Sequence, residues 1–187
     1  MAGFGETFAA RRQANARALE GFGTSPASHT AVLPGRLIRR GGERAVLYTI
    51  GYEKRAPDEL LDSILAVGVT VLADIREKPI SRLPAFRAAA LRATCEAQGI
   101  AYESWSCLGS TAPQRAALKA TGDFAAFARA FRRVATARMQ ADLQRLADRA
   151  RTHCIALLCY ERVHELCHRS IVADRLADLL DASILAL

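Results

Sequence analysis

From residue 46 to the C-terminus, short apolar segments alternate with longer segments whose apolar residues recur every three or four positions. The short segments have too few polar residues for a solvent-exposed face, which is typical of buried strands in a parallel sheet. The longer segments have the period of an amphipathic helix. The predicted strands are 46–50, 69–73, 100–103 and 154–159, and the predicted helices are 57–67, 84–98, a long helix from 124, and 168–181.

This alternation predicts an α/β fold: a mostly parallel sheet of four or more strands with helices on both faces, in a Rossmann-like three-layer arrangement. We expect residues 46–187 to form a single domain. Residues 106–123 are predicted to be a long loop, and loops of that length in a compact domain usually have a function. Residues 1–45 are rich in glycine and weakly periodic, which predicts a partly ordered basic extension.

The net charge is +7 over 187 residues, from 26 Lys and Arg, of which three are Lys, against 19 acids. Residues 1–45 hold seven Arg and three Glu, and so contribute +4 of this charge. A basic chain favours a polyanionic partner such as nucleic acid. A GC-rich coding sequence produces the same excess of Arg, so charge alone does not establish such a partner.

The apolar runs are too short for a membrane span, which needs about 18 consecutive apolar residues. The first residues contain no basic stretch followed by an apolar segment, so we expect no secretory signal and a cytoplasmic location. The five cysteines are an odd number, in a chain large enough to fold without cross-links. We therefore expect reduced thiols or metal ligands rather than a disulfide framework.

Reactive and charged side chains follow directly after each predicted strand. In open α/β sheets, ligands bind beyond the carboxyl ends of the strands, and in a parallel sheet these ends share one edge. The sequence therefore predicts a binding or catalytic cleft at that edge. The segments that would meet there are 51–53, 74–77, 103–105 with Gly109 and Ser110, 160–161, and 167–169.

Two arginines near the second strand are candidates for binding an anion. Asp74 and Arg76 are two residues apart, which places them on the same side of an extended strand. Their ion pair either fixes the loop or keeps the Asp74 carboxylate ionised so that it can act as a base. Ser81 and Arg82 follow in a loop bounded by prolines. The Arg82 guanidinium either binds a phosphate or carboxylate, or is simply solvent-facing.

The start of the last predicted helix carries Cys167, His168 and Arg169. A thiol at a helix N-terminus beside His and Arg meets the conditions that lower a cysteine pKa, so Cys167 is a candidate nucleophile. Alternatively, Arg169 and the helix N-terminus bind an anion, and Cys167 packs beneath. The phosphatase pattern, a Cys followed by Arg six positions later, is absent, because Ala173 stands at that position.

The fourth strand supplies two more candidates, Cys159 and Glu161. Glu161 is a second carboxylate that could work with Asp74 in general acid–base catalysis. We predict no cofactor, and keep a zinc site as an alternative, because the thiols and imidazoles here are soft ligands without the paired spacing of a zinc ribbon. The residues of that alternative are Cys159, His164, Cys167 and His168, with Cys154 or Cys107 nearby.

Three aromatic residues at the predicted edge, Tyr52, Tyr160 and Trp105, have two interpretations. They either stack on a planar ring such as a nucleobase, or pack as ordinary core and rim aromatics.

Several short motifs of the chain also resemble one known family. They are Thr49–Tyr52, Ala73–Arg76, Pro79–Arg82, Leu158–Glu161 and Cys167–Arg169, spread over residues 46–180. Together they resemble the bacterial family catalogued as domain of unknown function 488. The resemblance implies an α/β domain and a shared site built from the matching residues. It implies no reaction, because the family has no assigned activity.

Three functional hypotheses follow. The first is an enzyme acting on an anionic, nucleotide-like or nucleic-acid substrate, in which Asp74 and Glu161 move protons and Cys167 is the nucleophile. The second is a non-catalytic module that binds a nucleotide or nucleic acid, and the third is a zinc-binding or thiol redox protein. The residues predicted to bind the substrate are Gly51, Tyr52, Arg76, Ser81, Arg82, Gly109, Cys159, His168 and Arg169.

Overall fold

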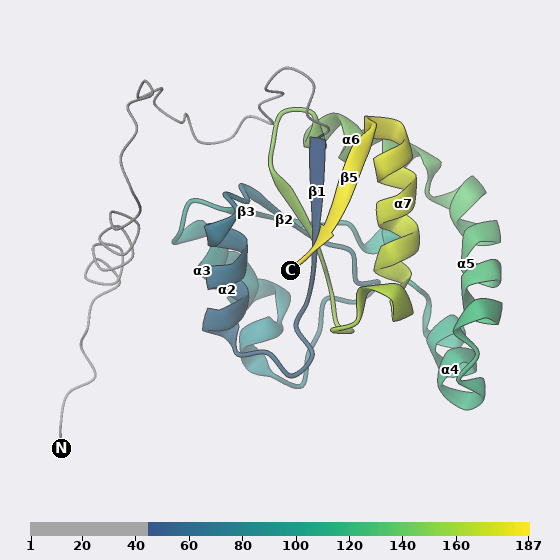
Figure 1. The fold of residues 1–187 in the computed structure, drawn as a ribbon. Coiled ribbons are helices and arrows are strands. Elements are labelled where there is room, and N and C mark those ends of the chain that lie inside the picture. Colours follow the sequence, from purple (N-terminus) through teal and green to yellow (C-terminus); the bar gives the residue numbers. More distant parts are fainter. Residues whose placement is uncertain (1–44) are drawn as a thin grey trace, which may run out of the picture. The chain divides into compact units, whose positions relative to one another are not determined.

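The computed structural model describes residues 45–187, apart from the side chains of residues 135–138. The expectations for residues 1–44 lie outside the described residues. Five parallel strands form one sheet in the order β3-β2-β4-β1-β5 (Figure 1). They are β1 (Ala45–Gly51), β2 (Val71–Asp74), β3 (Ala101–Ser104), β4 (Ile155–Cys159) and β5 (Ala182–Ala186).

The described helices lie between these strands along the sequence, and three of the α-helices follow one another between β3 and β4. The α-helices are α2 (Pro57–Ala66), α3 (Ala88–Glu96), α4 (Ala112–Thr121), α5 (Phe124–Arg138), α6 (Gln140–Ala150) and α7 (His168–Leu180). Three short 3-10 helices precede α3, α4 and α7: η1 (Pro84–Phe86), η2 (Ser106–Leu108) and η3 (His164–Leu166).

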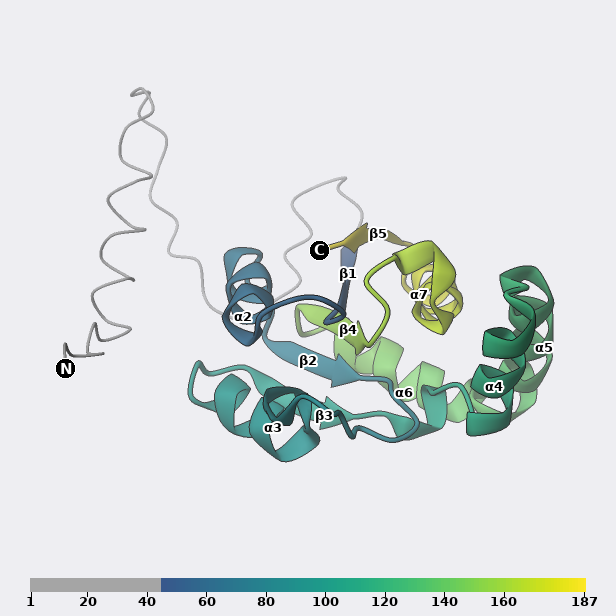
Figure 2. The ribbon, with the colours of Figure 1, turned by 90° about the horizontal axis from the view of Figure 1, so that it is seen from below.

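Helices cover both faces of the sheet. α2 and α3 lie on one face, and α5, α6 and α7 lie on the other (Figures 1 and 2). The buried apolar residues form two matching clusters, one with Leu60 of α2 and Leu91 of α3, the other with Phe131 of α5, Leu146 of α6 and Leu176 of α7. The predicted α/β fold, with a parallel sheet between two helical layers in a single domain, is therefore confirmed.

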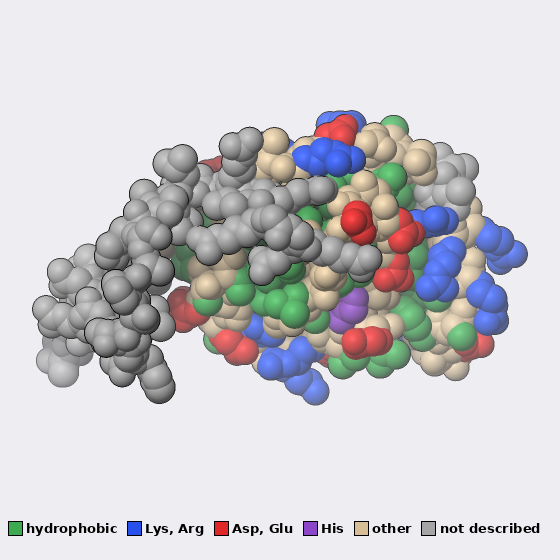
Figure 3. Space-filling model, turned by 45° about the horizontal axis from the view of Figure 1, so that its top comes forward, with side chains coloured by type: hydrophobic (Ala, Val, Ile, Leu, Met, Phe, Trp, Pro, Cys, Tyr) green, Lys and Arg blue, Asp and Glu red, His purple; other side chains and the backbone are tan. Residues whose placement is uncertain are grey.

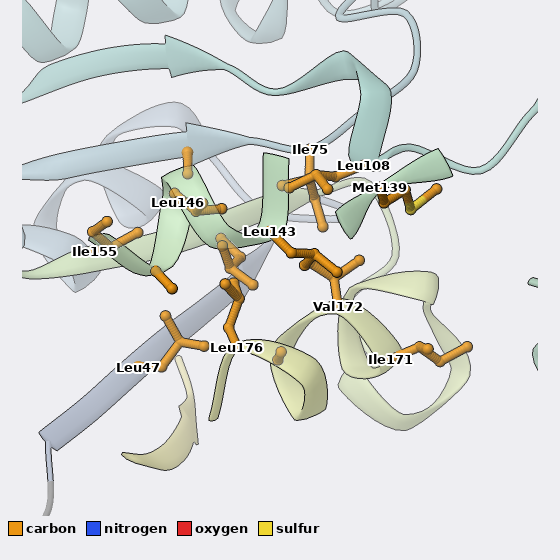
Figure 4. Close-up of a cluster of buried hydrophobic side chains, with 14 of the residues drawn as sticks. Leu47, Ile75, Leu108, Met139, Leu143, Leu146, Ile155, Ile171, Val172 and Leu176 are labelled. Atoms are coloured by element: carbon orange, nitrogen blue, oxygen red, sulfur yellow. The ribbon is translucent and has the colours of Figure 1, made fainter. Parts of the chain in front are cut away.

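The central strand β4 shows why the strands are continuous apolar runs. All five of its residues are buried. Ile155 and Leu157 belong to the cluster with α6 and α7, whereas Ala156 and Leu158 belong to the cluster with α2 and α3. Figure 4 shows the first cluster, where Ile155 and Leu47 from the sheet meet side chains of α6 and α7. Because both faces are covered, neither set of alternating side chains is polar.

The prediction of a loop over residues 106–123 is wrong, because this segment contains η2 and α4. A capping box begins α4: the backbone N–H of Thr111 donates to Oε1 of Gln114 at 2.8 Å. Pro113 stands in the first turn, and Gly122 ends the helix with a φ of +67°. The proline and glycine that suggested a loop are therefore the start and stop signals of a helix.

Two other boundaries carry no strong sequence signal. α7 ends at Asp181, whose φ of +49° is a conformation usually taken by glycine, and the chain then forms β5 beside β1. The long helix predicted from residue 124 is two helices, α5 and α6, which meet at the buried Met139.

The sheet topology creates a crevice at the carboxyl ends of the strands. β4 lies between β1 and β2, and the chain leaves β4 towards α7 on one face but leaves β1 and β2 towards α2 and α3 on the other. Neighbouring strands whose connections diverge in this way leave a space between the loops. None of the helices in the described part of the chain is long and apolar enough to cross a membrane.

Candidate functional site

A cavity of about 620 Å³ lies at the carboxyl ends of β1, β2 and β4. Its walls are formed by the segments that follow these strands, together with residues beside α4 and at the start of α7. Seven of the predicted catalytic and substrate-binding residues line it, namely Tyr52, Arg76, Ser81, Arg82, Cys159, Glu161 and His168.

Four side chains converge at this cavity and beneath it, and we call them the thiol cluster: Cys159, Glu161, Cys167 and His168. The thiols of Cys159 and Cys167 both donate to Oε2 of Glu161, at 3.1 and 3.0 Å. Nδ1 of His168 lies 3.7 Å from the Cys159 sulfur and 3.9 Å from the Cys167 sulfur. The four reactive atoms all lie within 4.8 Å of one another.

The ring of His168 is held in one orientation. Its Nε2 lies 3.2 Å from the carbonyl oxygen of Ile75, which can only accept a hydrogen bond. The proton of the neutral ring is therefore on Nε2, and Nδ1 presents a lone pair to the sulfurs. The ring also packs edge-on against Phe131 of α5, with the ring centroids 5.5 Å apart.

The two thiols have opposite pKa shifts. Burial raises the pKa of Cys159, but the Cys167 thiol and the His168 imidazole stabilise its thiolate more strongly, and its net pKa is well below the ordinary value. Burial and the adjacent Cys159 sulfur raise the pKa of Cys167 well above the ordinary value. Cys159 is therefore the more acidic thiol of the pair, and Cys167 is the less acidic one.

The other two members of the thiol cluster shift accordingly. Burial lowers the pKa of His168, but the Cys159 sulfur and the Glu161 carboxylate outweigh burial and raise it. Burial, followed by the charge on Cys159, raises the pKa of Glu161. When Cys159 loses its proton, these shifts favour a protonated imidazole and a protonated carboxyl group beside its sulfur.

Access also distinguishes the two sulfurs. Cys159 lines the cavity, whereas Cys167 is not among the lining residues and is 1% exposed. Cys167 is the N-cap of α7, and its sulfur accepts a hydrogen bond from the backbone N–H of Arg169 at 3.4 Å. The geometry thus favours Cys159 for the nucleophilic role that the sequence suggests for Cys167.

Arg169 lies beneath the thiol cluster and is 1% exposed. Its Nη1 donates to the carbonyl oxygen of Glu161 at 2.8 Å and approaches the Cys167 sulfur at 3.7 Å. Arg169 is not among the residues that line the cavity. Its burial and its contacts suit a positioning role, in which it holds the loop after β4 and the Cys167 sulfur, and its binding of an anion stays a prediction.

Asp74 and Arg76 form the expected ion pair, and both are buried. Oδ1 of Asp74 accepts hydrogen bonds from the backbone N–H of Arg76 at 3.1 Å and from its Nε at 2.8 Å, and Oδ2 accepts from Arg76 Nη2 and from the Tyr102 hydroxyl. Nη1 of Arg76 donates to the Tyr52 hydroxyl at 3.0 Å and to the carbonyl oxygen of Phe86 at 2.9 Å.

This network fixes the loop after β2. Burial alone would lower the pKa of Arg76, but its hydrogen bonds to Asp74 and the Asp74 charge outweigh burial and raise it. Burial and Asp74 likewise raise the pKa of Tyr102. The four acceptor positions of the Asp74 carboxylate are filled, which leaves none for a substrate proton. Asp74 is therefore better placed to position Arg76 than to act as the predicted base.

Gly51 and Gly109 are needed where two loops touch, and neither is among the cavity-lining residues. A Cβ atom on Gly51 would lie 1.9 Å from the carbonyl oxygen of Glu161, and one on Gly109 would lie 2.1 Å from the backbone nitrogen of Glu77. Such distances are far below van der Waals contact, so any other residue would push the loops apart. Both glycines position the loop segments that carry Glu161 and Arg76.

The outer part of the cavity combines cations with apolar side chains. Arg82 and Lys78 are exposed on its wall, and Ile80, Leu83 and Tyr160 are exposed beside them. The hydroxyl of the nominated Ser81, also on the wall, accepts a hydrogen bond from the backbone N–H of Leu83 at 3.1 Å, which makes it a turn residue. Figure 3 turns forward the side of the molecule where the strands begin, away from the cavity, and on that face Lys and Arg side chains lie in separate groups with acidic side chains between them.

Among the lining residues that are absent from the predicted catalytic and substrate-binding residues are Lys78, Ser110 and Arg115. Two of them could have been predicted from their neighbours in the sequence, because Lys78 lies between two of the motifs and Ser110 follows the nominated Gly109. Arg115 belongs to α4, in the segment predicted to be a loop, and pairs with Glu77 at 3.0 Å. Recognition of the capping box would have placed its side chain on a helix.

The thiol cluster contains the groups in the described residues that could hold a metal ion. Its membership differs from the predicted zinc set. Nδ1 of His164 lies 3.0 Å from the Thr49 hydroxyl, and Cys154 precedes β4 at the opposite edge of the sheet. Glu161 is the fourth member of the cluster in place of the predicted His164. Trp105, proposed as a stacking residue, is also not among the lining residues and instead donates to Glu103 at 3.3 Å.

Comparison with known proteins gives one match. Neither the curated proteins nor the solved structures contain a significant match to this chain. The model of the family described as Domain of unknown function DUF488 matches residues 56–176, which include the strands β2, β3 and β4, the thiol cluster and most of α7. That span is more than half of the 187 residues. The chain therefore belongs to the DUF488 family.

Proposed function

We propose that this protein is a thiol-dependent enzyme that acts on an anionic, nucleotide-like or nucleic-acid substrate, with Cys159 as its nucleophile. The observation that carries the proposal is the position of the Cys159 sulfur, on the cavity wall and 3.7 Å from Nδ1 of His168. A nucleophile, a base within reach and a third group that orients the base are the arrangement expected of nucleophilic catalysis. Here the orienting group is the carbonyl of Ile75.

The proposed chemistry is a displacement in two steps. His168 takes the proton of the Cys159 thiol, and the thiolate forms a bond to an electrophilic centre of the substrate. The bond to the leaving group breaks, and the leaving group departs with its electron pair and takes the proton from His168. Water then attacks the centre bound to sulfur, which releases the product and restores the thiol. Glu161, which accepts from both thiols, takes the proton of that water and passes it to the departing Cys159 sulfur.

The charges around the cavity support an anionic substrate. Lys78 and Arg82 are exposed on the wall, and neither has a carboxylate partner among the ion pairs of the described residues. Arg115 stands opposite Glu77, with which it pairs. Exposed guanidinium and ammonium groups beside a cavity are suited to phosphate or carboxylate oxygens.

The size and the apolar rim of the cavity support a substrate that also carries a flat apolar part. The volume of about 620 Å³ is within the usual range of small-molecule sites, about 300–1,000 Å³. Tyr160 is 48% exposed at the rim, where its ring and that of Tyr52 meet in a T-shaped contact at 5.4 Å, and an exposed aromatic ring at a cavity is suited to stacking on a planar group. All five cysteines are free thiols, which supports a reducing compartment, the cytoplasm.

The test is turnover of a panel of nucleotides and short oligonucleotides by the full chain in the presence of a chelator. Matched variants are Cys159→Ser and Cys154→Ser, because Cys154 is a thiol outside the thiol cluster. Turnover of at least one compound is expected in the wild type and in Cys154→Ser. In Cys159→Ser, turnover is expected to fall by at least about 10³-fold, and acid quenching of the wild type should trap a substrate fragment on the Cys159 peptide.

Three outcomes would contradict the proposal. Equal turnover in Cys159→Ser would remove the thiol from the mechanism. Saturable, salt-dependent binding without turnover would indicate a binding module rather than an enzyme. If no member of the panel bound or reacted, the anionic substrate class would be wrong.

A further inference from the structure

We propose that the thiol cluster binds one Zn²⁺ ion, and that the ion and the nucleophilic reaction exclude each other at Cys159. The ligands would be the two sulfurs of Cys159 and Cys167, an oxygen of Glu161 and Nδ1 of His168. The zinc site does not depend on the proposed function, whereas the exclusion rests on it.

The spacing of the four atoms fits a tetrahedral ion. Zinc bonds of about 2.3 Å to sulfur and about 2.0–2.1 Å to nitrogen and oxygen place neighbouring ligand atoms about 3.3–3.8 Å apart. In the structure, Oε2 of Glu161 lies 3.1 and 3.0 Å from the two sulfurs, and Nδ1 of His168 lies 3.7 and 3.9 Å from them. Shifts of a few tenths of an ångström along these four edges would bring them to tetrahedral values.

The groups around the thiol cluster are those that support metal ligands. Histidines that bind a metal usually donate their other ring N–H to a carboxylate or a carbonyl, as His168 does to Ile75 at 3.2 Å. The sulfur of Cys167 receives the backbone N–H of Arg169 at 3.4 Å and its Nη1 at 3.7 Å. Both contacts remain available to a thiolate that binds zinc.

Charge also favours a divalent cation at this position. With both thiols deprotonated, the ligands carry three negative charges, and Zn²⁺ leaves a net charge of −1. Arg169 is buried against Cys167, and its Nε has no hydrogen-bond partner in the described residues. Its positive charge offsets the remaining negative charge. Sulfur ligands select zinc over magnesium and calcium, which prefer sites made of oxygen alone.

Zinc binding and nucleophilic attack draw on the same sulfur electrons. As the ion binds, each thiol loses its proton to solvent, and each thiolate donates an electron pair to zinc. Nδ1 of His168 donates the lone pair that would otherwise accept the Cys159 proton. A zinc-bound chain would therefore have neither the free thiolate nor the free base, and the ion would act as a reversible inhibitor.

The experiment uses the full chain, stripped of metal with a chelator and then titrated with Zn²⁺ against a chromogenic competitor. We expect one ion per chain. Cys159→Ser and Cys167→Ser should abolish that binding, Glu161→Gln should weaken it at least about tenfold, and Cys154→Ser should leave it unchanged. Co²⁺ in place of Zn²⁺ should give sulfur-to-metal charge-transfer bands that are lost in the two cluster Cys→Ser variants.

A second measurement needs no variant and covers the case in which one fails to fold. One equivalent of Zn²⁺ should slow alkylation of Cys159 and Cys167 in the wild type, while Cys107 and Cys154 keep their rates. If Cys159 remained equally reactive, or if zinc bound equally well to Cys159→Ser, the zinc site would be wrong.

The two proposals fail in different ways. If zinc does not bind but the metal-free chain turns over substrate through Cys159, the inference is wrong and the proposed function stands. If zinc binds and turnover requires it, the zinc site stands, and both the exclusion and the thiol nucleophile are wrong. If zinc binds and turnover falls in proportion to occupancy, both proposals are supported.

Discussion

The sulfur of Cys159 and Nδ1 of His168 lie 3.7 Å apart although the residues come from different elements, the end of β4 and the first turn of α7. A hydrogen bond connects the two ends of the loop between these elements: Arg169 in the first turn of α7 donates to the carbonyl oxygen of Glu161, just after β4, at 2.8 Å. The geometry of the thiol pair thus depends on contacts below the cavity. The following predictions test those contacts.

Asp74→Asn should destabilise the fold strongly. The substitution leaves the guanidinium of Arg76 buried without a countercharge, which typically costs about 3–5 kcal/mol. The free energy of unfolding, from urea titration followed by circular dichroism, gives the cost. As a control, Glu96→Gln removes one member of an exposed ion pair with Arg92 and should cost less than about 1 kcal/mol. Equal costs for the two variants would mean that the buried pair does not fix the loop.

Gly51→Ala should both destabilise the protein and lower the reactivity of Cys159. The new Cβ would lie 1.9 Å from the Glu161 carbonyl, so the loop after β4 has to move. Overpacking of this kind costs about 1–3 kcal/mol. Gly99→Ala is the matched control, because its Cβ meets nothing within 4 Å and only its φ of +73° opposes the change. The account requires a loss of Cys159 alkylation rate in the first variant and none in the second.

Arg169→Met should disturb the thiol cluster rather than ligand binding alone. It removes the donors to the carbonyl oxygens of Glu161 and Arg162 and the nearby cation at Cys167. Each unsatisfied buried group costs about 1–3 kcal/mol. We expect a lower free energy of unfolding and altered alkylation of both cluster cysteines. A variant of wild-type stability that had lost only affinity for an anion would show that Arg169 contacts the ligand.

His164 should make the protein less stable at low pH. Burial, and then the charge of Arg169, lower the pKa of His164 below its ordinary value of about 6.5. As the pH falls, the unfolded chain therefore takes up this proton first, and the contribution of His164 to stability is lost as the pH falls from about 6.5 through its folded pKa.

The contribution of His164 can be isolated with His164→Gln. The difference in free energy of unfolding between this variant and the wild type, measured with metal chelated, should change between pH 7.5 and pH 5. The pKa of His168 is raised, so this group also makes stability depend on pH, but it is present in both proteins and its contribution cancels in the difference. A difference independent of pH would contradict the prediction.

Much of the fold could be predicted because its signals are local. The strands β1 and β4 are continuous apolar runs, and Pro57 and Gly68 mark the ends of the segment that contains α2. The position of the site followed from the rule that parallel strands end at a common edge. β5 could not be placed, because Asp181 rather than a glycine ends α7, and the helix–strand boundary is therefore unmarked.

The roles within the site depend on burial, which a sequence does not show. Cys159 and Cys167 are both cysteines close to Glu161, and only the three-dimensional structure shows which sulfur borders the cavity. Likewise, Arg82 and Arg169 are both arginines in motif positions, yet one is exposed on the cavity wall and the other is buried beneath the thiol cluster. The local sequence around each arginine does not distinguish these environments.

The most direct test of the central claim is the alkylation rate of each of the five cysteines, read by mass spectrometry at neutral pH in the presence of a chelator. Cys107 and Cys154 are more exposed than Cys159, but burial and Asp142 raise the pKa of Cys107 to about 11, and burial raises that of Cys154. The account predicts that Cys159 reacts first, at least about tenfold faster than either, because its lowered pKa favours the thiolate and its sulfur borders the cavity. If Cys107 or Cys154 reacted first and Cys159 stayed inert, Cys159 would not be the nucleophile.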